Sequence, residues 1–226
     1  MIDQLPYRPM GGLGIAYLLM VVIPLSIAPL PPFGPDADLV AFNTANHDAL
    51  LLSNYLAAFQ PPIVLIFLVF VAAVTRQAEE SSRGWQWLLI LAASVCTVAV
   101  TIVDTFFVCA EPFVVKLGQP VLALITQISL YGFLISFAMQ ALLLGAIGVA
   151  ALRLHFLPAW LGFVALLAAA VSALGTLGLL MTAGPFTATS PIALFASPFS
   201  LPVWITLVSI YWLVHPASHA PPVAAR

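Results

Sequence analysis

Long apolar stretches, separated by short polar segments, account for most of the chain. Six of them are long enough to cross a bilayer, because a spanning helix needs about 20 apolar residues. The six cover about residues 11–30, 48–75, 85–109, 120–152, 158–182 and 198–215. Strands of a membrane barrel alternate apolar and polar positions, whereas these stretches are continuous. The pattern therefore predicts an all-α, polytopic membrane bundle of about six transmembrane helices.

The composition agrees with lipid as the main solvent of this chain. Of its 226 residues, 63% are hydrophobic and only 6% are charged, whereas ordinary soluble domains carry about 25% charged residues. We expect a single transmembrane domain over residues 1–215 and a disordered Pro/Ala-rich tail over 216–226. The net charge is −2 and no basic block occurs, which argues against nucleic acid as a partner. The expected partners are the lipid bilayer and either further copies of the chain or a larger membrane complex.

Positive charges predict an orientation. Six spans place both termini on one side, and that side then holds most of the basic residues: Arg8, Arg76, Arg83, Arg153 and Arg226. The other side holds only Lys116. Because basic loops stay in the cytoplasm, we expect cytoplasmic termini and a multi-pass protein of a cell membrane, most simply a bacterial inner membrane.

Four tryptophans fall at the predicted inner ends of their helices: Trp85, Trp87, Trp160 and Trp212. Tryptophan is enriched where the bilayer meets water, because its ring is apolar and its N–H is polar. We therefore expect these four side chains to anchor the bundle at the inner interface.

Prolines interrupt two of the predicted spans. Pro24 should bend the first, and Pro61 with Pro62 should kink or break the second, because proline removes a backbone donor and clashes with the preceding turn. Gln60 precedes the double proline and is expected to bond carbonyls freed by that kink. The double proline could serve as a hinge.

Small residues recur at helical spacing in the fourth and fifth spans. Gly132 precedes Ser136, and Ala141 precedes Gly145, by four positions; the fifth span contains Gly162, Ala165, Ala169, Ala173, Gly175 and Gly178. Such faces allow helices to approach closely. We expect close packing within the bundle, with oligomerisation as the alternative. Gln140, deep in the fourth span, is expected to form a hydrogen bond between helices.

The third span contains a polar stripe. At 100° per residue, five side chains fall within about 40° of one line: Thr97, Thr101, Asp104, Val108 and Glu111. An ionised aspartate within hydrocarbon costs at least about 2.5 kcal/mol, so we expect this stripe to face the bundle interior. Alternatively, a protonated Asp104 bonds to Thr101 and only fixes the bundle.

Other polar residues of the predicted outer half could join this stripe. The polar entry to the second span offers Asn43, Asn46, His47, Asp48 and Asn54, and the fourth span contains Gln127 and Tyr131 four positions apart. Together they could line an outward-facing cavity with Asp104 at its floor.

Sequence motifs for catalysis and metal binding are missing. The chain contains no G-x-S-x-G, H-E-x-x-H or C-x-x-C motif. We therefore expect no cofactor, no catalytic residues and no metal site. The leading hypothesis is a non-enzymatic protein that binds a small hydrophobic or cationic ligand, or that serves as a subunit of a membrane assembly. The alternative is a proton- or cation-coupled transporter or channel that uses Asp104. A membrane enzyme comes third, because it would need Asp104, Glu111 and His47 to converge.

A short segment resembles a known group of proteins. Arg153, Leu157, Pro158, Trp160, Leu161 and Gly162 form an Arg-containing turn followed by L-P-x-W-L-G. This pattern is similar to the start of the fifth helix in a loose group of six-helix bacterial integral membrane proteins with a DUF4386-type layout. The resemblance implies a layout of about six helices and implies no activity or functional residues.

Overall fold

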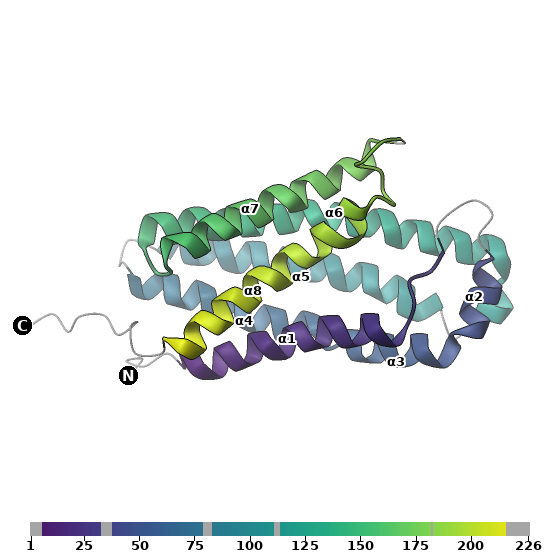
Figure 1. Ribbon diagram of the computed structural model, residues 1–226, viewed down its shortest axis with the longest axis horizontal. Helices are drawn as coiled ribbons and strands as arrows, with labels where there is room; N and C mark the ends of the chain where they lie inside the picture. Colours follow the sequence, from purple (N-terminus) through teal and green to yellow (C-terminus); the bar gives the residue numbers. More distant parts are fainter. Residues whose placement is uncertain (1–5, 33–37, 79–82, 111–113, 182, 216–226) are drawn as a thin grey trace, which may run out of the picture.

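The computed structural model describes residues 6–32, 38–78, 83–110, 114–181 and 183–215 (Figure 1). Six helices in these ranges are long and apolar enough to cross a membrane, which confirms the predicted all-α membrane bundle. The α-helices are α1 (Tyr7–Ile27), α2 (Leu39–Ala45), α3 (His47–Ala57), α4 (Gln60–Ala78), α5 (Arg83–Ala110), α6 (Val114–Leu154), α7 (Ala159–Thr176) and α8 (Ser197–Val214). A 3-10 turn (Leu177–Leu179) continues α7, and a π-helix (Ile192–Ala196) precedes α8.

Helix α6 lies at the centre of the arrangement. It packs chiefly against α5 and α7, and also against α2, α4 and α8, while α1 packs against α8, α3 and α4. Figure 1 shows α6 running on past the end of α7 towards α2. The bundle is therefore longer on the α5–α6 side than on the α7–α8 side.

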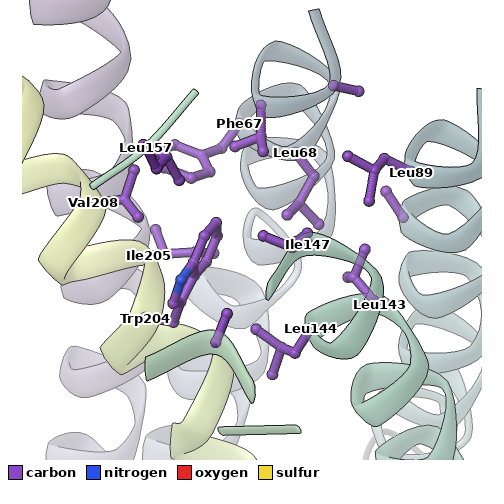
Figure 2. Packing of buried hydrophobic residues seen from close by; sticks show 14 of the residues in the cluster. Phe67, Leu68, Leu89, Leu143, Leu144, Ile147, Leu157, Trp204, Ile205 and Val208 are labelled. Atoms are coloured by element: carbon purple, nitrogen blue, oxygen red, sulfur yellow. The ribbon is translucent and has the colours of Figure 1, made fainter. Parts of the chain in front are cut away.

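The apolar core lies where α4, α5, α6 and α8 meet (Figure 2). Trp204 of α8 is fully buried there, in the same cluster as aliphatic side chains of α6 such as Leu144. Its indole Nε1 donates to the backbone oxygen of Leu161 at 3.1 Å, so the polar atom of this large side chain is satisfied. Burying Trp204 therefore adds packing area without an unpaired donor.

Glycines allow the closest helix contacts. A Cβ on Gly148 of α6 would lie 2.9 Å from the backbone oxygen of Gly162 in α7, and one on Gly175 would overlap Ser197. A Cβ on Gly178 would lie 3.0 Å from the Cα of Ala188. The expectation of close packing within the bundle is confirmed for Gly162, Gly175 and Gly178, and Gly148 adds a contact that was not expected. Oligomerisation stays a prediction.

The second span is broken, as the double proline predicts. Helix α3 ends at Ala57 and α4 begins at Gln60, so Pro61 and Pro62 occupy the first turn of α4. First-turn N–H groups have no partner within a helix, and proline is tolerated there for that reason. The interruption therefore precedes the prolines instead of falling on them. Whether the break acts as a hinge stays a prediction.

Gln60 compensates for the backbone donor that Pro24 lacks, and not for the kink at the double proline as expected. Its amide Nε2 donates to the backbone oxygen of Met20 in α1 at 2.7 Å. That oxygen would normally accept the N–H of residue 24, which is Pro24 and has none. The hydroxyl of Ser53 donates to the oxygen of Pro24 itself at 3.1 Å. Side chains from α3 and α4 thus satisfy the backbone of α1 around its proline.

One of the four predicted interfacial tryptophans is buried. Trp87 and Trp160 are 68% and 48% exposed, whereas Trp212 is 0% exposed. The indole of Trp212 packs against the rings of Tyr7, Phe67 and Phe70, at centroid distances of 5.8, 5.4 and 5.2 Å. The expectation for Trp212 was wrong because α1 covers the end of α8. The Tyr7–Trp212 contact also places the start of α1 beside the end of α8.

Charged side chains are separated between the two ends of the bundle. The described arginines lie where α1 and α5 start and where α4 and α6 end, which is one end in Figure 1: Arg8, Arg76, Arg83 and Arg153. Lys116 lies in the first turn of α6, and Asp38 and Asp48 lie at the starts of α2 and α3. These three residues belong to the opposite end. We refer to the first end as the arginine end.

Candidate functional site

A surface groove of about 450 Å³ lies between α5 and α6. Its lining is mostly aliphatic: Ile102, Val103, Leu124, Gln127, Ile128, Tyr131, Gly132 and Ile135. Val103 is only 7% exposed and a Cβ on Gly132 would lie 2.6 Å from its Cγ2, so these two residues form the floor. The isoleucines and Leu124 are exposed and form the walls. The volume falls within the range of about 300–1,000 Å³ that small-molecule sites occupy.

Two polar side chains of the groove have no partner in the described part of the chain. Gln127 and Tyr131 lie one turn apart on α6, and both are exposed. Neither forms a hydrogen bond with another described residue. By contrast, the neighbouring Thr126 hydroxyl bonds to the backbone oxygen of Leu122 at 2.9 Å. Because both side chains are exposed, their hydrogen-bonding groups are open to water or to another molecule outside the chain.

The polar stripe of the third span is only partly described. Thr97 is 8% exposed, and its hydroxyl has no hydrogen-bond partner in the described part of the chain. Thr101 is exposed, so the expectation of an inward-facing side chain is wrong at this position, and its hydroxyl bonds to the oxygen of Thr97 at 2.8 Å. The backbone of Asp104 belongs to α5. The side chain of Asp104, like Val108 and Glu111, lies outside the described structure.

The polar start of the second span does not join the groove. His47 is exposed and Asn54 is half-buried, and their helix α3 packs against α1 and α2. The amides of Asn43 and Asn46 donate to oxygens of their own helix, at 2.8 Å in both cases. Of the predicted site residues that the structure describes, only Gln127 and Tyr131 lie together in one groove. Among the described residues, no group of His, Cys, Asp or Glu is arranged to hold a metal ion.

A second polar cluster is buried between α6, α7 and α8. The amide Nε2 of Gln140 lies 3.0 Å from the hydroxyl of Ser172, 2.6 Å from that of Ser200 and 2.8 Å from the backbone oxygen of Ser197. Ser172 also donates to Ala168, and Ser200 to Ser197. The expected interhelical hydrogen bond of Gln140 is confirmed. The amide N–H groups of Gln140 and the hydroxyls of the three serines are all paired within the bundle, so the cluster leaves none of these donors for a ligand.

Sequence reasoning missed the serines of this cluster. Ser172 stands within a stretch of small residues, and Ser197 and Ser200 share a helix face at a spacing of three. Both patterns are typical of ordinary helix packing in membranes. Only the packing of α6, α7 and α8 against one another shows that these hydroxyls surround Gln140.

Comparison with known proteins adds no family assignment. No protein-family profile, no curated protein and no solved structure matches the chain. The resemblance of residues 153–162 to the six-helix bacterial group stays a prediction.

Proposed function

We propose that this protein is a non-enzymatic, membrane-embedded binding protein and that the α5–α6 groove is its ligand site. The observation that supports this proposal is the groove itself, in which aliphatic walls surround two hydrogen-bonding side chains that have no partner among the described residues. Ligand sites commonly combine apolar walls with a few polar groups that fix orientation. The ligand is accordingly a mostly apolar molecule with at least one hydrogen-bonding group.

We further propose that the arginine end faces the cytoplasm of a cell membrane. Four arginines at that end agree with the retention of positive charge on the cytoplasmic side. In a bacterial host, a C-terminal fluorescent-protein fusion should then be bright and a C-terminal alkaline phosphatase fusion inactive. The reverse pattern would refute this orientation.

The binding site is tested by native mass spectrometry of protein extracted from its membrane, which detects non-covalent adducts that remain bound. Ile128→Trp fills the groove, and Leu142→Trp adds the same ring to an exposed α6 position outside it. We expect wild type and Leu142→Trp to retain the adducts and Ile128→Trp to lose them. Retention of the same adducts by all three proteins, or by none, would refute the groove as a binding site.

A further inference from the structure

The arginine end carries two basic side chains at the boundaries of neighbouring membrane spans. One spanning segment ends at Arg76 in α4, and the next begins at Arg83 in α5. The second segment runs from Arg83 to Val103 over 21 residues. This corresponds to about 30 Å at about 1.5 Å per residue, which equals the thickness of the hydrocarbon layer. Both arginines therefore lie at the edge of this layer, where a guanidinium group extends into the adjoining polar headgroups.

Both arginines belong to the lipid-facing surfaces of their helices. On α4 the exposed positions Val69 and Arg76 are seven apart, and on α5 the exposed positions Arg83, Trp87 and Leu91 are four apart. Each set therefore shares one helix face. Helices α4 and α5 pack against each other, and the axes of helices in contact lie about 8–10 Å apart. The two guanidinium groups can thus reach one small anion between them.

The polar groups of this surface are not engaged within the described part of the chain. Neither Arg76 nor Arg83 forms an ion pair or a hydrogen bond with another described residue. Trp87 is 68% exposed, and its indole N–H also has no described partner. It lies about 6 Å along α5 from Arg83, on the hydrocarbon side. Tryptophan is enriched at this level of membrane proteins.

The position and chemistry of these groups match a phospholipid. Its phosphate lies in the headgroup layer, which extends about 5–8 Å beyond each face of the hydrocarbon, and its acyl chains lie within the hydrocarbon. Arginine binds phosphate through paired, charge-assisted hydrogen bonds. On the hydrocarbon side of the arginines, the exposed side chains of Val69 and Leu91 offer apolar surface to an acyl chain.

We propose that Arg76 and Arg83 bind the phosphate of a phospholipid in the leaflet at the arginine end. The indole of Trp87 lies beside the glycerol esters of this lipid, and one acyl chain runs along Val69 and Leu91. The site lies at the opposite end of the bundle from the α5–α6 groove. The inference therefore goes beyond the proposed function and does not depend on it.

Native mass spectrometry of the purified, lipid-depleted protein, titrated with phosphatidylglycerol, tests the site. We expect the double variant Arg76→Gln/Arg83→Gln to bind this lipid about tenfold more weakly, which corresponds to about 1.4 kcal/mol. The matched control is Arg8→Gln/Arg153→Gln, which removes the same charge from the arginine end outside the site and should leave binding unchanged. Equal weakening by the two double variants, or no weakening by either, would overturn the site.

Competition separates a lipid phosphate from a free one. Diacylglycerol has the acyl chains without the phosphate, and inorganic phosphate has no chains, so neither should displace phosphatidylglycerol at the same concentration. Displacement by diacylglycerol would contradict the role of the arginines. Displacement by inorganic phosphate would assign a site for free anions and exclude the lipid.

Two glutamates stand between the arginines in the sequence, Glu79 and Glu80, and both lie outside the described residues. Carboxylates repel a phosphate, so Glu79→Gln/Glu80→Gln should bind phosphatidylglycerol at least as tightly as the wild type. Weaker binding by this variant would contradict a site that recognises the phosphate.

The two proposals can fail separately. Ile128→Trp, which fills the α5–α6 groove, should bind phosphatidylglycerol as the wild type does. Loss of phosphatidylglycerol binding in Ile128→Trp together with normal binding in Arg76→Gln/Arg83→Gln would place the lipid in the groove and exclude the arginine site. Loss in the arginine variant alone supports the arginine site, whether or not Ile128→Trp retains the native adducts.

Discussion

Replacing Gln140 by leucine should destabilise the bundle without affecting the groove. The amide of Gln140 carries two N–H donors, and their acceptors belong to α7 and α8: the hydroxyls of Ser172 and Ser200 and the backbone oxygen of Ser197. Hydrogen bonds between helices in membranes are worth about 0.6 kcal/mol on average and at most about 1.7. Losing two of them therefore costs about 1–3 kcal/mol. Leucine is close to glutamine in size, so little of this loss comes from a cavity.

The measurement is reversible unfolding in mixed micelles with increasing sodium dodecyl sulfate, followed by far-ultraviolet circular dichroism. The matched control is Gln127→Leu, the same substitution on the same helix at an exposed position. It should change the free energy of unfolding by no more than about 0.5 kcal/mol, while weakening retention of the native adducts in the groove. Equal destabilisation by the two substitutions would refute the distinction between a structural glutamine and a ligand-binding one.

Two further predictions concern α1. Gln60→Leu should lower the free energy of unfolding by about 1 kcal/mol in the wild type. In a Pro24→Ala background the loss should be much smaller, because the N–H of residue 24 can then bond to the Met20 oxygen. Additive effects of the two substitutions in a four-variant unfolding cycle would contradict the pairing of Gln60 with that oxygen. Gly14→Ala should cost about 1–3 kcal/mol by overpacking, because its new Cβ would lie 2.9 Å from Phe67 and would overlap Ser209. Gly12→Ala is the control, because no atom lies within 4 Å of its Cβ position. It should be neutral or stabilise the protein by up to about 1 kcal/mol. A larger loss of thermal stability for Gly12→Ala than for Gly14→Ala would refute the close contact between α1 and α8.

Parts of the candidate site could be predicted from the sequence and parts could not. The spacing of Gln127 and Tyr131 places both on one face of a helix, and both line the α5–α6 groove; the predicted cavity with Asp104 at its floor stays a prediction. The same reasoning assigned Thr101 to the interior, where it is not, and grouped His47 and Asn54 with α5, although α3 packs against α1 and α2. A helix period gives the relative direction of side chains on one helix, and it carries no information about which helix lies opposite.

The amino-acid sequence alone was enough for the number of spans, the break near Pro61 and the segregation of arginines to one end. These properties are local. In lipid each segment must satisfy its own backbone hydrogen bonds, and a run of about 20 apolar residues is long enough to form a spanning helix. Which residues lie beside each polar side chain could be determined only from the tertiary structure. A helix that is apolar on all sides has no polar face to mark which side is buried, so its rotation and partners follow from packing. That packing buries Gln140 among serines, pairs Gln60 with the backbone of α1, and leaves Gln127 and Tyr131 exposed in the α5–α6 groove.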